Sequence, residues 1–259
     1  MTLRILPASL LLPAMMLLNS PGLRAEEPAA PLTKAQLEQT IRTYLLDHPE
    51  LMMEMNQALQ KKVADQQREI VQAALSTKRV ELNSDARSPV AGPAKDGDGV
   101  VTVVEFFDYR CGYCKKVNAT VQKLVADDPS IRVVFKEFPI LGPESTVAAT
   151  AALAAHQQGA YLKFHRALMG SSDLSLEGIL RVAAESGLDT ERLKKDMAKP
   201  ELQTALARNR ELGEALAIQA TPSFVIGDQV VPGAIDEAGF RGMIAKAKEQ
   251  SKSIRAATR

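Results

Sequence analysis

Val100-Val-Thr-Val-Val-Glu-Phe-Phe107 is the stretch that decides the fold. An apolar run of this length, rich in β-branched and aromatic residues, predicts a central strand that is buried on both faces. A helix is predicted from Cys111 to about Ala126, and Ile131 to Phe138 predicts a second strand. A strand, a helix and a strand in this order imply parallel pairing, so the sequence predicts an α/β fold.

The chain has only two cysteines, and they stand as Cys111-Gly-Tyr-Cys114 where the first strand gives way to the helix. Two thiols at this spacing and in this place are typical of reversible disulfide exchange. Unpaired backbone N–H groups and the helix dipole favour an anion at a helix N-terminus. We therefore expect Cys111 to be partly thiolate.

Other uses of the cysteine pair fit the sequence less well. A structural zinc site needs four ligands, and none of the histidines has the spacing of a ligand pair. Haem attachment would need a histidine directly after the second cysteine, where Lys115 stands. A structural disulfide that closes so short a loop would stabilise little. The three histidines of the chain are His48, His156 and His165. We therefore expect no metal and no cofactor.

The first 25 residues predict a cleaved secretion signal. Arg4 precedes an apolar stretch from Ile5 to Leu18, and Leu23-Arg24-Ala25 ends in the small residue that a signal peptidase prefers. An uncleaved anchor is the alternative interpretation. Export would place the cysteine pair in an oxidising compartment, where it would serve as a catalyst.

The charge of the chain excludes one class of partner. Removal of residues 1–25 takes away Arg4 and Arg24 and no acids, which leaves 30 basic against 31 acidic residues and a net charge of −1. A near-neutral chain lacks the basic surface of nucleic-acid-binding proteins, so we expect no nucleic acid partner.

Residues 26–82 are predicted to form a helical region of their own. Thr33 and Gln36 are a candidate capping box, and Asp47-His48-Pro49-Glu50 separates two helices, with His48 as a boundary residue. The second helix carries a heptad seam that is either an oligomer interface or a face packed on the chain's own domain. The seam consists of Met52, Asn56, Leu59, Val63, Gln66, Ile70 and Ala73.

Met52, Met53 and Met55 raise the possibility of a copper-binding stress protein, since thioethers are soft ligands that suit Cu(I). Adjacent methionines on a helix point to different faces, however, and methionine is a common filler of adaptable interfaces. Packing is the interpretation that we favour.

Residues 83–259 are predicted to hold the catalytic domain. The linker Asn83 to Asp98 is rich in Ser, Pro, Gly and Asp, and residues 143–217 have a helical pattern throughout. Short strands return at 223–226 and 229–231, and Gly227-Asp228 between them predicts a hairpin. The last helix is predicted at 236–248. A helical block is therefore inserted between two halves of one sheet. His156 and His165 fall inside the block, and we expect each to be a helical histidine whose polar atoms are satisfied.

Two motifs resemble a known family: Val104-Glu-Phe-Phe-Asp-Tyr-Arg-Cys-Gly-Tyr-Cys-Lys115 and, about a hundred residues later, Ala220-Thr-Pro-Ser-Phe224. Together they look like the DsbA-like thiol-disulfide oxidoreductases, whose thioredoxin fold is interrupted by a helical domain. With its helical extension, the mature chain is most similar to the ScsC (suppressor of copper sensitivity) proteins.

The resemblance implies roles for single residues. Cys111 corresponds to the nucleophile that attacks a substrate disulfide, and Cys114 to the thiol that resolves the mixed disulfide. Pro222 corresponds to the cis-proline beside the cysteines, and Thr221 would offer its backbone to an extended substrate peptide. Gly112 and Tyr113 between the cysteines would also contact substrate.

Glu105 corresponds to the family's buried acid beneath the active site, with Lys136 as its expected charge partner. A carboxylate at that position can carry the proton of Cys114, which would make both residues part of the catalytic site. The alternative is a buried ion pair that serves only folding.

The motif departs from that of the better-known DsbA oxidases, which have Pro-His where this chain has Gly112-Tyr113, and valine where it has Thr221. Both residue choices resemble the disulfide isomerases DsbC and DsbG. Tyr113 brings no cation to stabilise a thiolate, so we expect a weaker oxidant than a Cys-Pro-His-Cys protein.

The resemblance thus implies a periplasmic disulfide isomerase or reductase. Its substrates would be misfolded or disulfide-containing exported proteins, and a membrane thiol reductase would keep it reduced. A dithiol oxidase is the alternative enzyme. The extension implies a homo-oligomer, and a trimer is favoured, as in some ScsC relatives.

Overall fold

The computed structural model describes residues 31–97 and 99–258, so the expected signal at 1–25 lies outside the described residues. The chain divides into two compact units, Met1–Ala58 and Leu59–Arg259. The division falls inside helix α2 (Glu50–Thr77), earlier than the boundary after residue 82 that we expected. None of the helices in the described ranges is long and apolar enough to cross a membrane.

A mixed five-stranded sheet in the order β1-β3-β2-β4-β5 lies at the centre of the second unit. The two strands predicted first, β2 (Val101–Phe107) and β3 (Ile131–Glu137), pair in parallel through the helix α4 (Gly112–Asp127). The hairpin of β4 (Ser223–Ile226) and β5 (Gln229–Pro232) is also confirmed, and Gly227 at its turn has a φ of +64°.

One strand was missed by the sequence analysis, which treated residues 83–98 as a linker. Strand β1 (Val90–Ala91) pairs antiparallel with β3 and is only two residues long. The next residue, Gly92, has a φ of +86°, and a Cβ there would lie 2.3 Å from the carbonyl oxygen of Ile131. Only glycine allows this close backbone approach.

Each face of the sheet carries its own apolar cluster, because alternate side chains of a strand point to opposite faces. One cluster includes Val103 and Phe107 of β2, together with side chains of α4 and of α10 (Glu237–Thr258). The other includes Val104 and Phe106 of β2, together with side chains from the end of α2, from α3 (Arg79–Asn83) and from α9 (Pro200–Ala215). A strand buried on both sides is what the uninterrupted apolar run predicted.

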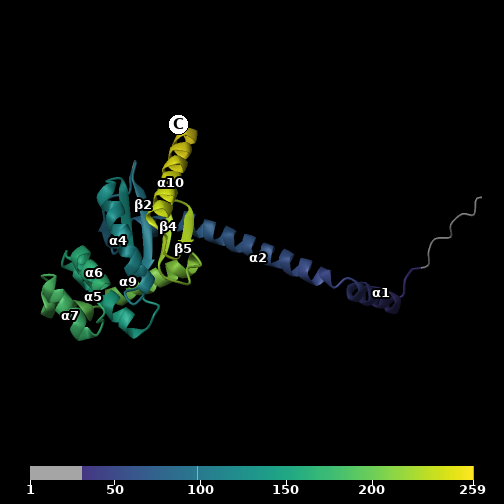
Figure 1. Cartoon of the computed structure of the whole chain (residues 1–259), viewed down its shortest axis with the longest axis horizontal. Helices are drawn as coiled ribbons and strands as arrows, with labels where there is room; N and C mark the ends of the chain where they lie inside the picture. Colours follow the sequence, from purple (N-terminus) through teal and green to yellow (C-terminus); the bar gives the residue numbers. More distant parts are fainter. Residues whose placement is uncertain (1–30, 98, 259) are drawn as a thin grey trace, which may run out of the picture. The chain divides into compact units, whose positions relative to one another are not determined.

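The inserted helical block is confirmed between β3 and β4. Figure 1 shows α5, α6 and α7 gathered on the side of the sheet where α4 lies, away from β5. The block consists of α5 (Pro143–Gln157), α6 (Tyr161–Gly170), α7 (Leu176–Glu185), α8 (Thr190–Met197) and α9 (Pro200–Ala215).

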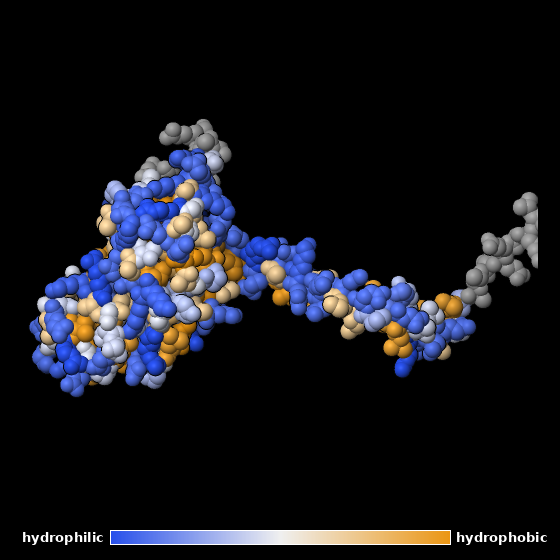
Figure 2. Space-filling model, in the orientation of Figure 1, coloured by the Kyte–Doolittle hydropathy of each residue, from blue (hydrophilic) through white to orange (hydrophobic). Residues whose placement is uncertain are grey.

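The first unit begins with α1 (Lys34–Asp47), and the capping box of Thr33 and Gln36 is present at its start. His48 ends α1 and lies 2.9 Å from Glu50 through its Nδ1 atom, so it is a boundary residue as predicted. None of the residues of α1 is buried. Figure 2 shows apolar side chains among the hydrophilic ones on the surface of these helices.

Helix α2 contributes only its C-terminal end to the core of the second unit. Leu75 and Leu82 of α3 are buried there, whereas the seam residues Leu59, Val63 and Ile70 are 55–61% exposed. These three seam residues are therefore not packed into the core around the sheet.

Candidate functional site

The two cysteines lie at the start of α4, directly after the turn that follows β2. Cys111 is the N-cap residue of α4, and its sulfur accepts a hydrogen bond from the backbone N–H of Cys114 at 3.4 Å. Cys111 is 7% exposed and Cys114 is fully buried, and both are free thiols. Of the two, only Cys111 offers any surface to a substrate.

The second motif reaches the cysteines through the sheet. Strand β4 pairs antiparallel with β2, which brings the loop before β4 to the end of the sheet where Cys111 lies. The Cys111 thiol donates to the backbone carbonyl of Thr221 at 3.2 Å, and the Thr221–Pro222 peptide bond is cis. The structure thus brings together four predicted site residues: both cysteines, Thr221 and Pro222.

Gly112 and Tyr113 occupy the first turn of α4, between the cysteines. The Tyr113 ring is 65% exposed, and the ammonium of Lys116 lies 5.4 Å from its centroid. Tyr113 is therefore an exposed aromatic surface beside Cys111, where it can contact a substrate chain.

Burial controls the acidity of the groups that lie behind Cys111. Desolvation raises the pKa of the Cys114 thiol, and the backbone N–H of Asp108 opposes this rise. Glu105 is also buried, and desolvation raises its pKa to about 8. A carboxyl group with this pKa exchanges a proton close to neutral pH, as a proton carrier for Cys114 must.

The expected pairing of Glu105 with Lys136 is wrong. In the β2–β3 register Glu105 stands opposite Phe135, while Lys136 stands opposite Phe106. Paired residues of adjacent strands share a face, and neighbours along a strand point to opposite faces. The side chains of Glu105 and Lys136 therefore lie on opposite faces of the sheet.

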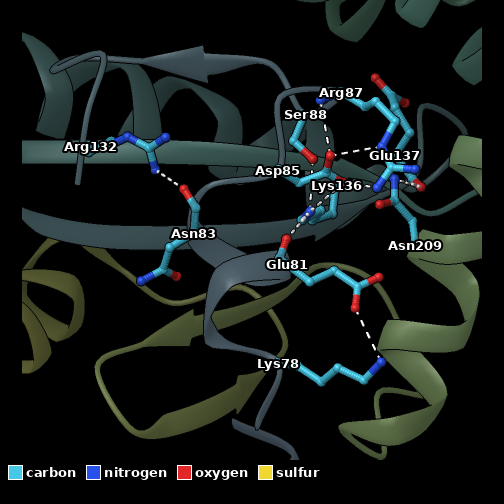
Figure 3. A network of polar contacts seen from close by, with 10 residues as sticks. All are labelled: Lys78, Glu81, Asn83, Asp85, Arg87, Ser88, Arg132, Lys136, Glu137 and Asn209. Atoms are coloured by element: carbon cyan, nitrogen blue, oxygen red, sulfur yellow. Dashed lines mark hydrogen bonds and ion pairs between the residues drawn. The ribbon is translucent and has the colours of Figure 1, made fainter. Parts of the chain in front are cut away.

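Lys136 instead holds the segment that leads out of α3. Its ammonium is fully buried and donates to the Glu81 carbonyl at 2.7 Å and to the Ser88 hydroxyl at 2.8 Å, as Figure 3 shows. The Asp85 carboxylate lies 3.7 Å from it. Burial lowers the pKa of Lys136 to about 8. These contacts make Lys136 an anchor for residues 81–88 and give it no place at the cysteines.

Sequence reasoning also missed a buried polar cluster beside the active site. The hydroxyls of Tyr109 and Tyr161 donate to one oxygen of Glu137, at 3.1 and 2.8 Å. The Nδ1 atom of His165 lies 3.0 Å from the Tyr109 hydroxyl, which satisfies this helical histidine as predicted. Desolvation raises the pKa of Glu137 and lowers the pKa of His165 to about 3. The signal in the sequence was the charged pair Lys136-Glu137 inside a largely apolar predicted strand.

In the described part of the chain, His, Cys, Asp and Glu side chains form no group of three or more that could hold a metal ion.

Family models identify the fold and the extension. A model of the DSBA-like thioredoxin domain matches residues 102–245. The chain belongs to this DsbA-like family. A second model, of the copper resistance protein ScsC N-terminal domain, matches residues 34–66, so the extension is similar to that of ScsC.

Solved structures of DsbA-like and ScsC proteins are similar to this chain. A thioredoxin-like oxidoreductase from Silicibacter pomeroyi DSS-3 is 47% identical with a TM-score of 0.63, over 66% of this chain and 98% of that one. ScsC of Proteus mirabilis, in a transitional conformation, is 30% identical with a TM-score of 0.62, over 85% and 98% of the two chains.

Among curated relatives, Na(+)/H(+) antiporter NhaA 3 of Salinispora tropica is 32% identical over 143 residues, which is 54% of this chain. The chain spans only 22% of the length of this antiporter.

Glu105→Gln should remove a pH-dependent loss of stability. An acid whose pKa is raised to about 8 in the folded state keeps a proton that the unfolded state loses near pH 4.5, so stability falls as the pH rises between these values. At pH 8 the glutamine variant should unfold at a higher urea concentration than the wild type, because its free energy of unfolding should be larger by up to about 3 kcal/mol. At pH 4 the two proteins should unfold at the same urea concentration.

Urea titrations of both proteins at the two pH values measure this difference. Glu54→Gln, at an exposed glutamate of α2, is the matched control and should leave the pH profile unchanged. Parallel pH profiles for wild type and Glu105→Gln would show that Glu105 does not titrate as described.

Proposed function

We propose that this protein is an exported thiol-disulfide oxidoreductase that reduces or isomerises disulfides in misfolded proteins. The observation that supports the proposal best is the geometry of Cys111, whose sulfur lies at a helix N-terminus and next to the cis-proline loop, with Cys114 buried behind it. Such an arrangement separates an attacking thiol from a resolving thiol.

The reaction begins when the Cys111 thiolate attacks a disulfide of the substrate. A mixed disulfide forms and one substrate sulfur leaves as a thiolate. Cys114 then gives its proton to a base and attacks the sulfur of Cys111, which releases the second substrate thiol and leaves Cys111 and Cys114 joined as a disulfide. Glu105 is the base that we assign to this step. It is buried on the face of the sheet against which Cys114 packs, and its raised pKa suits proton transfer.

In isomerisation a substrate thiol attacks the mixed disulfide before Cys114 does. The enzyme then leaves in its reduced form while the substrate keeps its number of disulfides. After a complete reduction, an external dithiol must reduce the Cys111–Cys114 disulfide, and we assign this role to a membrane thiol reductase. The residues between the cysteines favour isomerisation. Tyr113 brings no cation to stabilise a thiolate, so the reduced form should be stabilised less than in a Cys-Pro-His-Cys oxidase.

The helical extension supports a homo-oligomer, and we propose a trimer. The apolar residues of α1 are all exposed, as is the seam of α2, and exposed apolar stripes of this kind pack against other helices. Several dithiol sites on one scaffold would raise the local concentration of thiols around a bound substrate.

Two refolding assays test the choice between isomerase and oxidase. With a substrate whose disulfides are scrambled, the reduced protein should restore native pairing. With a fully reduced substrate, the oxidised protein should form disulfides more slowly than a Cys-Pro-His-Cys oxidase does. The reverse order of the two activities would favour the dithiol oxidase.

A further inference from the structure

Asp108 lies between β2 and the cysteines, and its carboxylate is fully engaged. The side chain is 1% exposed. One oxygen accepts from the backbone N–H of Arg110 at 2.7 Å and from the Ser145 hydroxyl at 2.8 Å. The other accepts from the backbone N–H groups of Ile140 and Leu141, at 2.9 and 3.0 Å. A carboxylate with four donors in a buried place makes strong, charge-assisted hydrogen bonds.

These hydrogen bonds join three segments at the active-site end of the sheet. Arg110 belongs to the turn before Cys111, Ile140 and Leu141 belong to the loop after β3, and Ser145 lies in the first turn of α5. The Asp108 carbonyl also accepts from the backbone N–H of Cys111 at 3.0 Å. Asp108 thus holds the turn before the reactive thiol from its side chain and from its backbone.

The guanidinium of Arg110 strengthens the same connection from the other side of the turn. It donates to the Leu141 carbonyl at 2.5 Å and lies 3.3 Å from the Glu144 carboxylate. The loop after β3 is therefore tied to the turn before Cys111 by three hydrogen bonds, two to the buried Asp108 carboxylate and one from the Arg110 guanidinium at the surface.

We propose that Asp108 is a positioning residue for thiol exchange: its carboxylate fixes the turn that places Cys111 at the Thr221 carbonyl and that leads into the helix turn carrying Cys114. This inference rests on the proposed function. The Asp108 carboxylate acts through the backbone and does not meet the substrate.

The resolving step depends most on this placement. Cys114 must lose its proton inside the protein before it can attack the mixed disulfide, and its burial disfavours the thiolate. The Asp108 backbone N–H opposes this rise in the pKa of the Cys114 thiol. If the turn relaxes, this amide moves and the thiolate of Cys114 forms less readily.

Asp108→Asn replaces one of the two hydrogen-bond-accepting oxygens by an NH₂ group without changing the shape of the side chain. One asparagine oxygen can still accept from Ile140 and Leu141, and the Ser145 hydroxyl can turn to accept from the new NH₂ group. The backbone N–H of Arg110 then has no acceptor. The matched control is Ser145→Ala, which removes a hydrogen bond from the same carboxylate but leaves every contact to the turn.

The experiment measures two rates with the full chain and a fluorescent peptide disulfide. The first is the formation of the mixed disulfide at Cys111, and the second is its resolution by Cys114. We expect Asp108→Asn to slow resolution about tenfold, as the loss of one hydrogen bond to a charged group would, and to slow formation much less. Ser145→Ala should keep both rates within about twofold of wild type at a similar melting temperature.

Equal resolution rates in wild type and Asp108→Asn would overturn the inference, as would an equal slowing in Ser145→Ala. Should the wild type form no mixed disulfide, the proposed function itself would fail and the inference with it. If Asp108→Asn does not fold, hydrogen exchange of the wild type decides. The amides of Arg110, Ile140 and Leu141 should then exchange as slowly as those of β2, and exchange at the rate of exposed loops would overturn the inference.

Discussion

Cys111→Ala should abolish disulfide exchange, whereas Cys114→Ala should trap the protein on its substrates as mixed disulfides. Loss of an attacking nucleophile removes the first step, and we expect turnover to fall at least about a thousandfold. Loss of the resolving thiol leaves that first step intact, because Cys111 keeps its place at the N-terminus of α4 and beside the Thr221 carbonyl. Non-reducing gels of each variant with a disulfide-containing substrate, before and after dithiothreitol, measure both outcomes.

Alkylation provides the control for this assignment. With one cysteine in each variant, the Cys111 thiol should react with iodoacetamide and the Cys114 thiol should react far more slowly, since it is fully buried and its pKa is raised. Equal alkylation rates near neutral pH, or mixed disulfides in Cys111→Ala, would contradict the assignment.

Two charges in the α2 seam should turn the proposed oligomer into monomers and remove most of the proposed isomerase activity. Leu59→Lys together with Val63→Lys places two ammonium groups on the exposed apolar seam, where they would have to be desolvated in an interface between copies. Each catalytic unit stays complete, so reduction of a small disulfide should continue at the wild-type rate. Refolding of a scrambled protein should slow about tenfold or more, because the second thiol site no longer acts at high effective concentration.

Light scattering measures the mass, and the two activity assays measure the separation of functions. Gln60→Lys together with Ala64→Lys adds the same charge to exposed positions of the same helix outside the seam, and it should leave mass and activity unchanged. A wild-type protein that is already monomeric, or a seam variant with full refolding activity, would contradict the proposed role of the extension.

The parts of the fold that depend on neighbouring residues could be predicted from the sequence. Three local patterns each predicted one local structure, and all three structures are present. They are the apolar run before the cysteines, the turn residues of the last hairpin, and the capping box of Thr33 and Gln36. The place of the cysteine pair at the start of α4 was predictable for the same reason. Two cysteines separated by two residues at a strand-to-helix turn are typical of disulfide exchange.

The contacts that depend on strand register could not be predicted. Lys136 was expected to be the charge partner of Glu105, yet a shift of one residue in register decides which face of the sheet each side chain joins. The cluster of Tyr109, Glu137 and His165 joins a turn, a strand and an inserted helix, and no local pattern in the sequence connects them.

The C-terminal boundary of the helical extension could not be predicted from the sequence either. A boundary after residue 82 matched the change in composition, but Leu75 and Leu82 pack into the core beneath the sheet, and Lys136 holds the Glu81 carbonyl. A truncation that removes residues up to 82 would therefore damage the catalytic unit, whereas one that ends at Ala58 follows the division of the chain.

The redox equilibrium of the protein with glutathione tests the central claim most directly. The fraction of the Cys111–Cys114 disulfide is measured by mass spectrometry after alkylation, across a series of glutathione ratios. We predict a fully reversible couple that is more reducing than the roughly −120 mV of DsbA, as suits an isomerase or reductase. An equilibrium at or above that potential, or cysteines that do not form a disulfide with each other, would contradict the account.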